Sequence, residues 1–296
     1  MDALVTTEDR FAGLPGYPWA ARHWASDATA GLPLAYVDAG PADASQVFLC
    51  LHGNPSWSYL YRKMIPVFVA SGARVVAPDL LGFGRSAKPV HESDHTFEMH
   101  RGALLAFVDA LNLRGITLVV QDWGGLFGLT LPMEAPERYA RLLLMNTGFG
   151  TGEVTEGFRA WRAFSNSRPD LDVGALFARS EPTLTPAEVA AYDAPFPDAR
   201  YKAALRAFPN LVPDGADAPG AAIGRAARDW FARAWHGESF MAIGMKDPVM
   251  GEPAMLALRA AIPRCPEPLR VHAGGHFVQE HGAQIAKAAL AHWATR

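Results

Sequence analysis

Short apolar runs alternate along this chain with longer stretches in which apolar residues recur at helical spacing. Residues 96–111 are an example of the second kind, with an apolar face that includes Phe97, Leu104 and Leu111. Strands are expected in the short runs near His23, Tyr36, Phe48, Val75, Leu118, Leu143, Ala242 and Val271. Alternation of this kind predicts a mostly parallel sheet with helices on both of its faces.

The alternation stops near Gly148. From about residue 150 to residue 228 the sequence is rich in Ala, Pro and Phe, and its pattern indicates short helices without a strong strand. We therefore expect a core formed by residues 1–149 and 229–296, with residues 150–228 inserted as a helical cap. Such a cap lies over the carboxyl ends of the strands, where it encloses a dry pocket.

Composition restricts the partners of the chain. Its 296 residues are 50% hydrophobic and carry a formal net charge of −3, so a large core is expected and a nucleic-acid partner is not. No apolar run approaches the roughly 18 residues that a membrane span needs, and residues 1–18 do not resemble a signal peptide. Cys50 and Cys265 share no motif, which favours reduced thiols and a cytoplasmic location.

The most informative motif places an aspartate where a strand turns sharply into a helix. The apolar run at residues 118–120 leads through Gln121 to Asp122, and Trp123 and two glycines open a helical pattern. In many hydrolases this turn, the nucleophile elbow, holds a Ser or Cys nucleophile. A serine that attacked a saturated carbon would form a stable ether, whereas a carboxylate forms an ester that water can cleave. Asp122 is therefore the candidate nucleophile.

Two downstream residues complete a catalytic set. His276 lies in a glycine-rich segment near the C-terminus and is the candidate general base, and Asp247 follows a strand-like run and would orient the histidine. The order nucleophile, acid, histidine is the order of α/β-hydrolases. The sequence His-Gly-Asn-Pro from His52 follows another strand, so the oxyanion hole is expected to use the backbone N–H groups of Asn54 and Trp123.

These motifs resemble those of the haloalkane dehalogenases of the α/β-hydrolase superfamily, within the branch that uses two tryptophans. The resemblance is carried by HGNPSWSYLYR from His52, PDLLGFGRSAKP from Pro78, VVQDWGG from Val119, GFRAW ending at Trp161, MAIGMKD ending at Asp247 and GGHFVQE from Gly274. It implies the α/β-hydrolase fold, with a mostly parallel eight-stranded sheet, helices on both faces and an inserted α-helical cap.

The resemblance also implies a reaction and its partners. A small halogenated hydrocarbon and water would give alcohol and halide through an alkyl ester on Asp122, without a metal or an organic cofactor. The indole N–H groups of Trp123 and Trp161 would hold the halide, because indole donates hydrogen bonds and cannot accept them. A monomer would suffice. By position and resemblance, the candidate pocket residues are Phe149, Phe158, Phe164, Phe208 and Val249.

One feature is shared with another branch of the family. That branch uses an asparagine in the position of Asn54 as its second halide donor and places its catalytic acid after the sixth strand. Residues 142–148 of this chain contain no carboxylate. Asp247 therefore remains the expected acid and Trp161 the expected second donor, with the Asn54 side chain as a secondary contributor.

The nearest alternative function is epoxide hydrolysis, which uses the same aspartate, histidine and acid. Epoxide opening needs acids on the departing oxygen, usually two cap tyrosines, and Tyr192 and Tyr201 are candidates. A non-catalytic binding protein on the same scaffold is a second alternative. The complete catalytic set argues against it.

Two further motifs are interpreted as coincidences. Residues 91–95 match the zinc motif His-Glu-x-x-His, but Pro89 lies just upstream and Ser93 and Asp94 favour a turn rather than the continuous helix that zinc binding needs. Gly82 and Gly84 lack the full spacing of a dinucleotide-binding loop.

Overall fold

The core of the protein is an eight-stranded, mostly parallel sheet, seen here in a computed structural model that describes residues 1–295. The last residue of the expected segment 229–296 thus lies outside the described residues. The strand order is β10-β9-β8-β7-β4-β5-β3-β2. The strands are β2 (Arg22–Trp24), β3 (Leu34–Ala39), β4 (Val47–Leu51), β5 (Arg74–Pro78), β7 (Ile116–Gln121), β8 (Tyr139–Met145), β9 (Glu238–Gly244) and β10 (Leu269–Val271).

Every strand expected from the sequence is present in this sheet. The strands from β10 to β5 in the sheet order pair in parallel, whereas β3 pairs antiparallel with both β5 and β2. A second, two-stranded sheet pairs β1 (Ala3–Leu4) with β6 (Lys88–Pro89). These two-residue strands are too short to produce a hydrophobic alternation, and the sequence pattern did not predict them.

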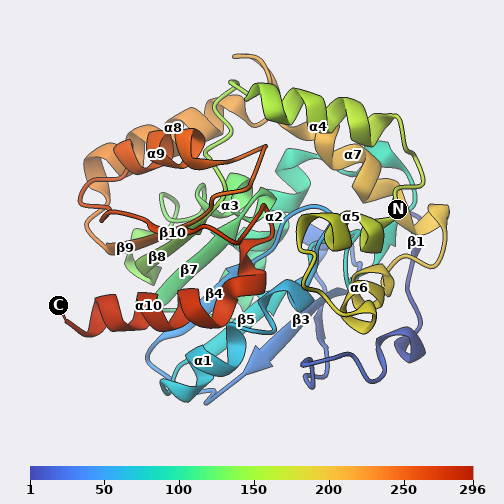
Figure 1. Ribbon diagram of the computed structural model, residues 1–296, viewed down its shortest axis with the longest axis horizontal. Helices are drawn as coiled ribbons and strands as arrows, with labels where there is room; N and C mark the ends of the chain where they lie inside the picture. The colour runs from blue at the N-terminus through green and yellow to red at the C-terminus, as the bar shows by residue number, and fades with distance from the viewer. Residues whose placement is uncertain (296) are drawn as a thin grey trace.

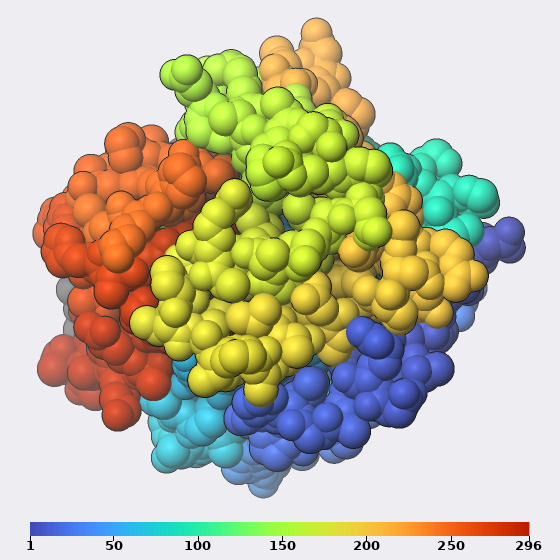
Figure 2. Space-filling view, turned by 45° about the vertical axis from the view of Figure 1, so that its right-hand side comes forward, coloured from blue at the N-terminus to red at the C-terminus, as the bar shows by residue number. Residues whose placement is uncertain are grey.

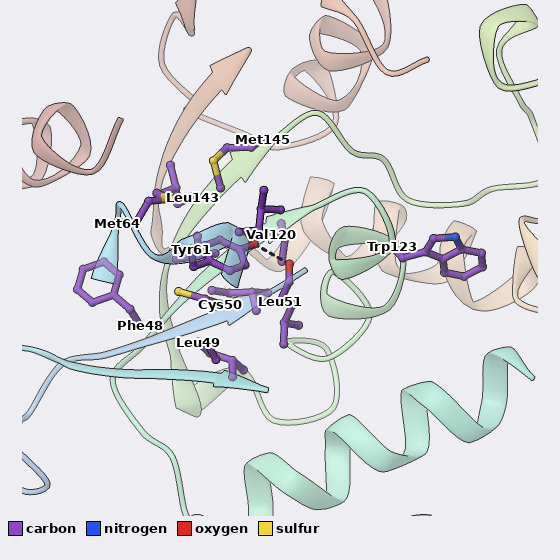
Figure 3. Packing of buried hydrophobic residues seen from close by; sticks show 14 of the residues in the cluster. Phe48, Leu49, Cys50, Leu51, Tyr61, Met64, Val120, Trp123, Leu143 and Met145 are labelled. Atoms are coloured by element: carbon purple, nitrogen blue, oxygen red, sulfur yellow. Dashed lines mark hydrogen bonds between the residues drawn. The ribbon is translucent and has the colours of Figure 1, made fainter. Parts of the chain in front are cut away.

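The central strands are buried on both faces, which explains why their sequences are continuously apolar. Every residue of β4 and β7 is buried. Figure 3 shows the packing around β4, with Phe48, Cys50 and Leu51 among the labelled residues. Phe48 stacks on Phe68, with ring centroids 3.8 Å apart. The Tyr61 hydroxyl donates a hydrogen bond to the carbonyl oxygen of Leu51 at 2.7 Å, so its one polar group is satisfied inside the core.

Helices cover both faces of the sheet (Figure 1). One face carries α1 (Ile65–Ala70) and α10 (Gly282–Ala294), which pack against each other; the other carries α2 (Phe97–Ala110), α3 (Trp123–Gly128), α8 (Ala221–Ala234) and α9 (Glu252–Ala260). The helix expected at residues 96–111 is α2. Thr96 caps it, because its Oγ1 accepts the N–H of Met99 at 3.1 Å.

Four α-helices follow β8 within the segment expected to be the cap: α4 (Glu156–Asn166), α5 (Val173–Ser180), α6 (Pro186–Asp193) and α7 (Ala203–Leu211). The side chains of Thr155, Asp172 and Thr185 cap the first three of them. In Figure 2 the atoms of this segment, coloured lime to gold, cover one face of the molecule. The expected cap boundary at residue 228 falls inside α8, whose Phe231 packs against Phe149 of the core at 5.6 Å.

A buried ionic cluster joins the cap to the core. Arg62 makes two hydrogen bonds to the carboxylate of Glu280, at 2.6 and 2.8 Å, and a third to Glu188 of α6 at 2.8 Å. Tyr192 of α6 also donates to Glu280. The side chains of Arg62 and Glu280 are each 2% exposed, so each charge is compensated only by its partners.

Within residues 1–295, no helix combines the length and the apolar character that crossing a membrane would require.

Candidate active site

Asp122 lies at the turn between β7 and α3, with φ of 48° and ψ of −125°. This conformation is unfavourable for a residue with a side chain, and strain of this kind is concentrated at functional sites. The backbone around it is tightly held: its N–H donates to the Asn146 carbonyl at 3.0 Å, and Thr147 Oγ1 donates to its carbonyl at 2.7 Å. A Cβ on Gly124 would overlap the carbonyl oxygen of Leu51. The turn therefore requires glycine there, as the sequence indicates.

Two backbone N–H groups meet the carboxylate of Asp122. The N–H of Asn54 donates to Oδ2 at 2.9 Å, and the N–H of the adjacent Trp123 also lowers the pKa of the carboxyl. Gly53 allows this approach, because a Cβ at that position would overlap the aspartate side chain. The two groups expected to form the oxyanion hole are thus brought together. The other carboxylate oxygen of Asp122, Oδ1, faces His276 and lies 3.7 Å from its Nε2.

His276 bridges the two acids. Its Nδ1 lies 2.7 Å from Oδ2 of Asp247, and its Nε2 points to Asp122. Burial alone would lower the pKa of His276, but the carboxylates of Asp247 and Asp122 outweigh burial and raise it to about 9. Burial raises the pKa of Asp122 above its ordinary value, an effect that His276 and the two N–H donors only partly offset. The arrangement pairs an imidazole with a carboxylate on each side.

Asn146 supports the acid and was missed from the sequence. Its Nδ2 donates to Oδ2 of Asp247 at 2.9 Å, while the N–H of Val249 donates to Oδ1 at 2.7 Å. Burial would raise the pKa of Asp247, but contact with His276 and with the backbone N–H groups of Val249 and Met250 outweighs burial and lowers it. Asn146 lies within residues 142–148, which contain no carboxylate and therefore gave no candidate for the catalytic acid. The signal available in the sequence was a polar residue directly after a buried strand.

Three contacts hold the loop that carries His276, and one of them comes from the cap. The backbone N–H of Lys246 donates to the Gly274 carbonyl at 3.0 Å, and Nε2 of Gln121 donates to the His276 carbonyl at 3.0 Å. Oε1 of Glu181, just after α5, accepts the N–H of Gly275 at 2.9 Å. The Glu181 side chain is 3% exposed, and burial raises its pKa to about 7. No sequence signal marked Glu181.

These groups surround a largely apolar cavity of about 370 Å³ between the cap and the core. Its lining residues are Asn54, Asp122, Trp123, Phe158, Trp161, Leu176, Arg179, Ser180, Pro182, Pro209, Lys246, Pro248, Val249, Gly275, His276 and Phe277. Trp57 and Trp235 use their indole N–H groups in hydrogen bonds to protein oxygens. Among the described residues, no such acceptor bonds the indole N–H of Trp123 or Trp161. The cavity thus brings together one carboxylate, one imidazole and two free indole donors, and the cationic residues Arg179 and Lys246 also line it.

Comparison with known proteins agrees with this geometry. A family model described as the α/β-hydrolase fold matches residues 46–283. A haloalkane dehalogenase from Psychrobacter cryohalolentis is 42% identical and aligns with 97% of this chain and 96% of its own. Another from Mycobacterium marinum is also 42% identical, over 97% and 98% of the two chains. The structure described as tetrameric haloalkane dehalogenase DpaA from Paraglaciecola agarilytica NO2 superposes with a TM-score of 0.96 at 46% identity, covering 98% of each chain.

The chain belongs to the haloalkane dehalogenases. It is thus an α/β-hydrolase that cleaves carbon–halogen bonds, as the motifs predicted.

The candidate pocket residues of the dehalogenase separate into two groups. Phe158 and Val249 line the cavity, and Phe149 lines a neighbouring one. Phe208 and Phe164 line neither. Phe208 lies behind Trp123, with ring centroids 4.9 Å apart, and Phe164 stacks on Trp161 at 5.8 Å. Both therefore support a tryptophan. Whether a residue lines a cavity or packs behind a tryptophan depends on the rotation of its helix, which the sequence does not show.

Tyr192 and Tyr201, the candidate acids for epoxide opening, do not line the cavity of the dehalogenase. The hydroxyl of Tyr192 is buried and donates to Glu280, and Tyr201 packs against the hydrophobic core. The segment with the zinc-like pattern forms a short 3₁₀ helix, η4 (Glu92–Asp94), rather than a continuous α-helix. The Nδ1 of its last histidine, His95, instead lies 3.2 Å from Nε2 of His100.

Proposed function

We propose that Asp122 is the nucleophile and that the reaction begins with its Oδ1. This oxygen attacks the halogen-bearing sp³ carbon, so that a carbon–oxygen bond forms while the carbon–halogen bond breaks and the halide leaves with the electron pair. The support is geometric, because the backbone N–H of Asn54 holds Oδ2 at 2.9 Å while Oδ1 faces the cavity side of His276. The product of this step is an alkyl ester of Asp122.

Trp123 and Trp161 bind the leaving halide in this proposal. Both line the cavity that contains Asp122, and both indole N–H groups are free to donate. This assigns the chain to the two-tryptophan branch. Asn54 also lines the cavity, and its buried Oδ1 has no partner within the described chain. Its principal role remains that of backbone donor, with its side-chain amide as a secondary halide contact.

The second step hydrolyses the ester. His276 Nε2 takes a proton from water, and the resulting hydroxide attacks Cγ of Asp122. The N–H groups of Asn54 and Trp123 stabilise the oxyanion, and Asp247 stabilises the imidazolium through its 2.7 Å contact with Nδ1. Collapse of the tetrahedral intermediate releases the alcohol and regenerates the carboxylate. Alcohol, halide and a proton leave the site.

The observation that carries this proposal is the meeting of Asp122, His276 and two free indole donors in one largely apolar cavity. Its test is a single turnover of 1-bromobutane in H₂¹⁸O with enzyme in excess. The butanol should contain ¹⁶O from Asp122, and a peptide containing Asp122 should gain ¹⁸O. Labelled butanol with unlabelled Asp122 would show direct attack by water and overturn the ester mechanism.

The matched control is Asp122→Ala, which should release no halide from chloro-, bromo- or iodoalkanes under conditions in which the wild type releases halide and alcohol in equal amounts. Epoxides run in parallel test the alternative. Diol formation by the wild type, without halide from any haloalkane, would favour epoxide hydrolysis instead.

Assembly and location belong to the same proposal. Every residue assigned to the mechanism comes from one chain, so a monomer would be competent, although the related DpaA is described as tetrameric. Sedimentation velocity measures the assembly directly. Both cysteines, Cys50 and Cys265, are free and buried, which agrees with a reducing compartment such as the cytoplasm. Cell fractionation tests that location.

A further inference from the structure

Two cationic residues line the cavity that contains Asp122, and the proposed mechanism uses neither. Arg179 belongs to the last turn of α5, and Lys246 follows β9, directly before the catalytic acid. Both are exposed although they line the cavity. A residue with both properties lies where the cavity meets solvent, a region called the mouth below. The mouth therefore carries one cation from the expected cap and one from the core.

Neither cation is neutralised by an ion pair within residues 1–295. The Arg179 guanidinium lies 5.0 Å from the ring centre of Phe164, which in turn stacks on Trp161. Burial raises the pKa of Glu181, and the nearby charge of Lys246 opposes this effect only in part. Both positive charges thus remain available to an anion that enters the mouth.

The mouth contains a further donor, the hydroxyl of Ser180, which also lines the cavity. A Cβ on Gly275 would lie 3.0 Å from its Oγ, so the hydroxyl is beside the loop that carries the catalytic histidine. Among the described residues, no protein group hydrogen-bonds this hydroxyl. Guanidinium, ammonium and hydroxyl groups all donate, and a carboxylate accepts from each of them.

The charge of the cavity lining contrasts with that of the whole protein. Among the described lining residues Asp122 is the only carboxylate, and it faces His276. The two cations at the mouth therefore outnumber the acids of the lining, whereas the whole chain carries a formal net charge of −3. A local positive field of this kind concentrates anions at the site.

The two cations are separate from the reacting groups. Burial lowers the pKa of His276, and Asp247 and Asp122 raise it; neither Arg179 nor Lys246 is among these influences. An anionic group that meets the cations is therefore remote from the carbon that Asp122 attacks. It belongs at the far end of a substrate that extends from Asp122 to the mouth.

We propose that the mouth is a subsite for a carboxylate, and that the preferred substrates are haloalkanes with a terminal carboxylate opposite the halogen. Arg179, Lys246 and the Ser180 hydroxyl would bind the carboxylate, while the apolar walls hold the alkyl chain. This inference rests on the proposed function, because it takes Asp122 as the nucleophile. It adds a charge to the substrate class that the dehalogenase selects.

The experiment compares three bromides that differ in the charge of the far end. They are 6-bromohexanoate, the neutral 6-bromohexanamide and 6-bromohexylamine, which is a cation at neutral pH. In the wild type at low ionic strength, kcat/KM for the carboxylate should exceed that for the amide by about fivefold or more, because each exposed ion pair contributes up to about that factor. The ammonium compound should be poorer than the amide.

Variants then assign the preference to the two cations. In Arg179→Gln and in Lys246→Gln, the ratio of kcat/KM for the carboxylate to that for the amide should fall about two- to fivefold. The double variant Arg179→Glu with Lys246→Glu should prefer the ammonium compound over the carboxylate. Arg233→Gln is the matched control, because Arg233 of α8 is exposed, lacks an ion pair within residues 1–295 and does not line the cavity. Its ratio should equal that of the wild type.

Each comparison is a ratio within one protein preparation, so a loss of folded enzyme cancels. Equal kcat/KM values for the three bromides in the wild type would overturn the subsite. So would unchanged ratios in both glutamine variants, which would limit the cations to halide release, or an equal fall in Arg233→Gln, which would indicate the field of the whole protein. Failure of the proposed function is distinguishable, because Asp122→Ala would then still release bromide from the neutral amide.

Discussion

At the scale of single residues, the charge state of His276 depends on what happens to Asp122. In the free enzyme both neighbouring carboxylates raise the pKa of the histidine to about 9, so the ring is protonated at neutral pH. A protonated ring stabilises the Asp122 anion but cannot accept a proton from water. Formation of the ester removes the charge of Asp122 and with it one cause of the raised pKa. In the proposed mechanism, the first step therefore prepares His276 to act as the base in the second.

This coupling predicts a shift in the titration of His276. In Asp122→Asn, an uncharged mimic of the ester, the pKa of His276 should be lower than in the wild type, so the ring loses its proton at a lower pH. The measurement is an NMR titration of the imidazole ¹⁵N signals in both proteins. An unchanged or higher pKa of His276 in the variant would contradict the mechanism of activation.

At the scale of elements, the cap contributes to the catalytic loop as well as to the pocket wall. Glu181 follows α5 and accepts the N–H of Gly275, the residue directly before His276. Its other oxygen lies 3.5 Å from Nε2 of His281. The remaining contacts of this loop described above come from the core. We therefore expect Glu181 to be a positioning residue, through which the packing of the cap on the core affects the orientation of His276.

The expected effect of Glu181→Ala is selective. Alkylation does not use His276, so the pre-steady-state burst of bromide should keep its rate, whereas ester hydrolysis should slow by about tenfold or more, since small misplacements of a catalytic group have large effects. Mass spectrometry should then show the alkyl-enzyme accumulating during turnover. Glu181→Gln keeps an acceptor oxygen and should recover most of the rate.

A purely structural role of Glu181 would have a different signature. Both steps would slow together in Glu181→Ala, with a matching loss of thermal stability and no accumulation of ester. Asp198→Ala removes another cap carboxylate, one that is exposed and paired with Arg200, and should change neither step.

At the scale of the whole molecule, the junction of cap and core depends on the buried cluster around Arg62. The guanidinium contacts Glu280 from the segment after His276 and Glu188 from the cap, and it lies over the Tyr59 ring at 4.2 Å. Burial lowers the pKa of Arg62, but its tyrosine and carboxylate neighbours outweigh burial, so the net shift is upward. The charge is therefore retained inside the protein and holds three segments together.

Arg62→Ala should lower the free energy of unfolding by about 3–5 kcal/mol, because it leaves the Glu280 carboxylate buried without its main partner. Chemical denaturation followed by tryptophan fluorescence measures this loss. Arg270→Ala breaks a half-exposed pair with Glu252 and should have a far smaller effect. If both variants lost the same free energy of unfolding, the buried Arg62 cluster would stabilise the protein no more than the half-exposed pair does, which would contradict the prediction.

The sequence predicted most of the fold because its signals are local. Buried parallel strands need continuous apolar runs, and an element boundary is marked by the residues that cap or break it, as Thr96 does for α2. The cap boundary at residue 228 stays a prediction. It falls within α8, which continues the Ala-rich composition of the expected cap while its Phe231 packs on Phe149. Composition changes gradually there, and only packing separates the two parts.

For the site, the sequence by itself predicted the chemical groups: a carboxylate at the elbow, a histidine with its acid, two backbone donors and two tryptophans. Trp123 begins α3, whereas Trp161 lies within α4. The tertiary structure alone decided which distant residues support these groups. Asn146 and Glu181 contact Asp247 and Gly275 across about a hundred positions of sequence, and Phe158 and Val249 line the same two cavities. Local preferences set backbone angles and element ends, whereas these contacts depend on how the cap settles on the core, which no single segment encodes.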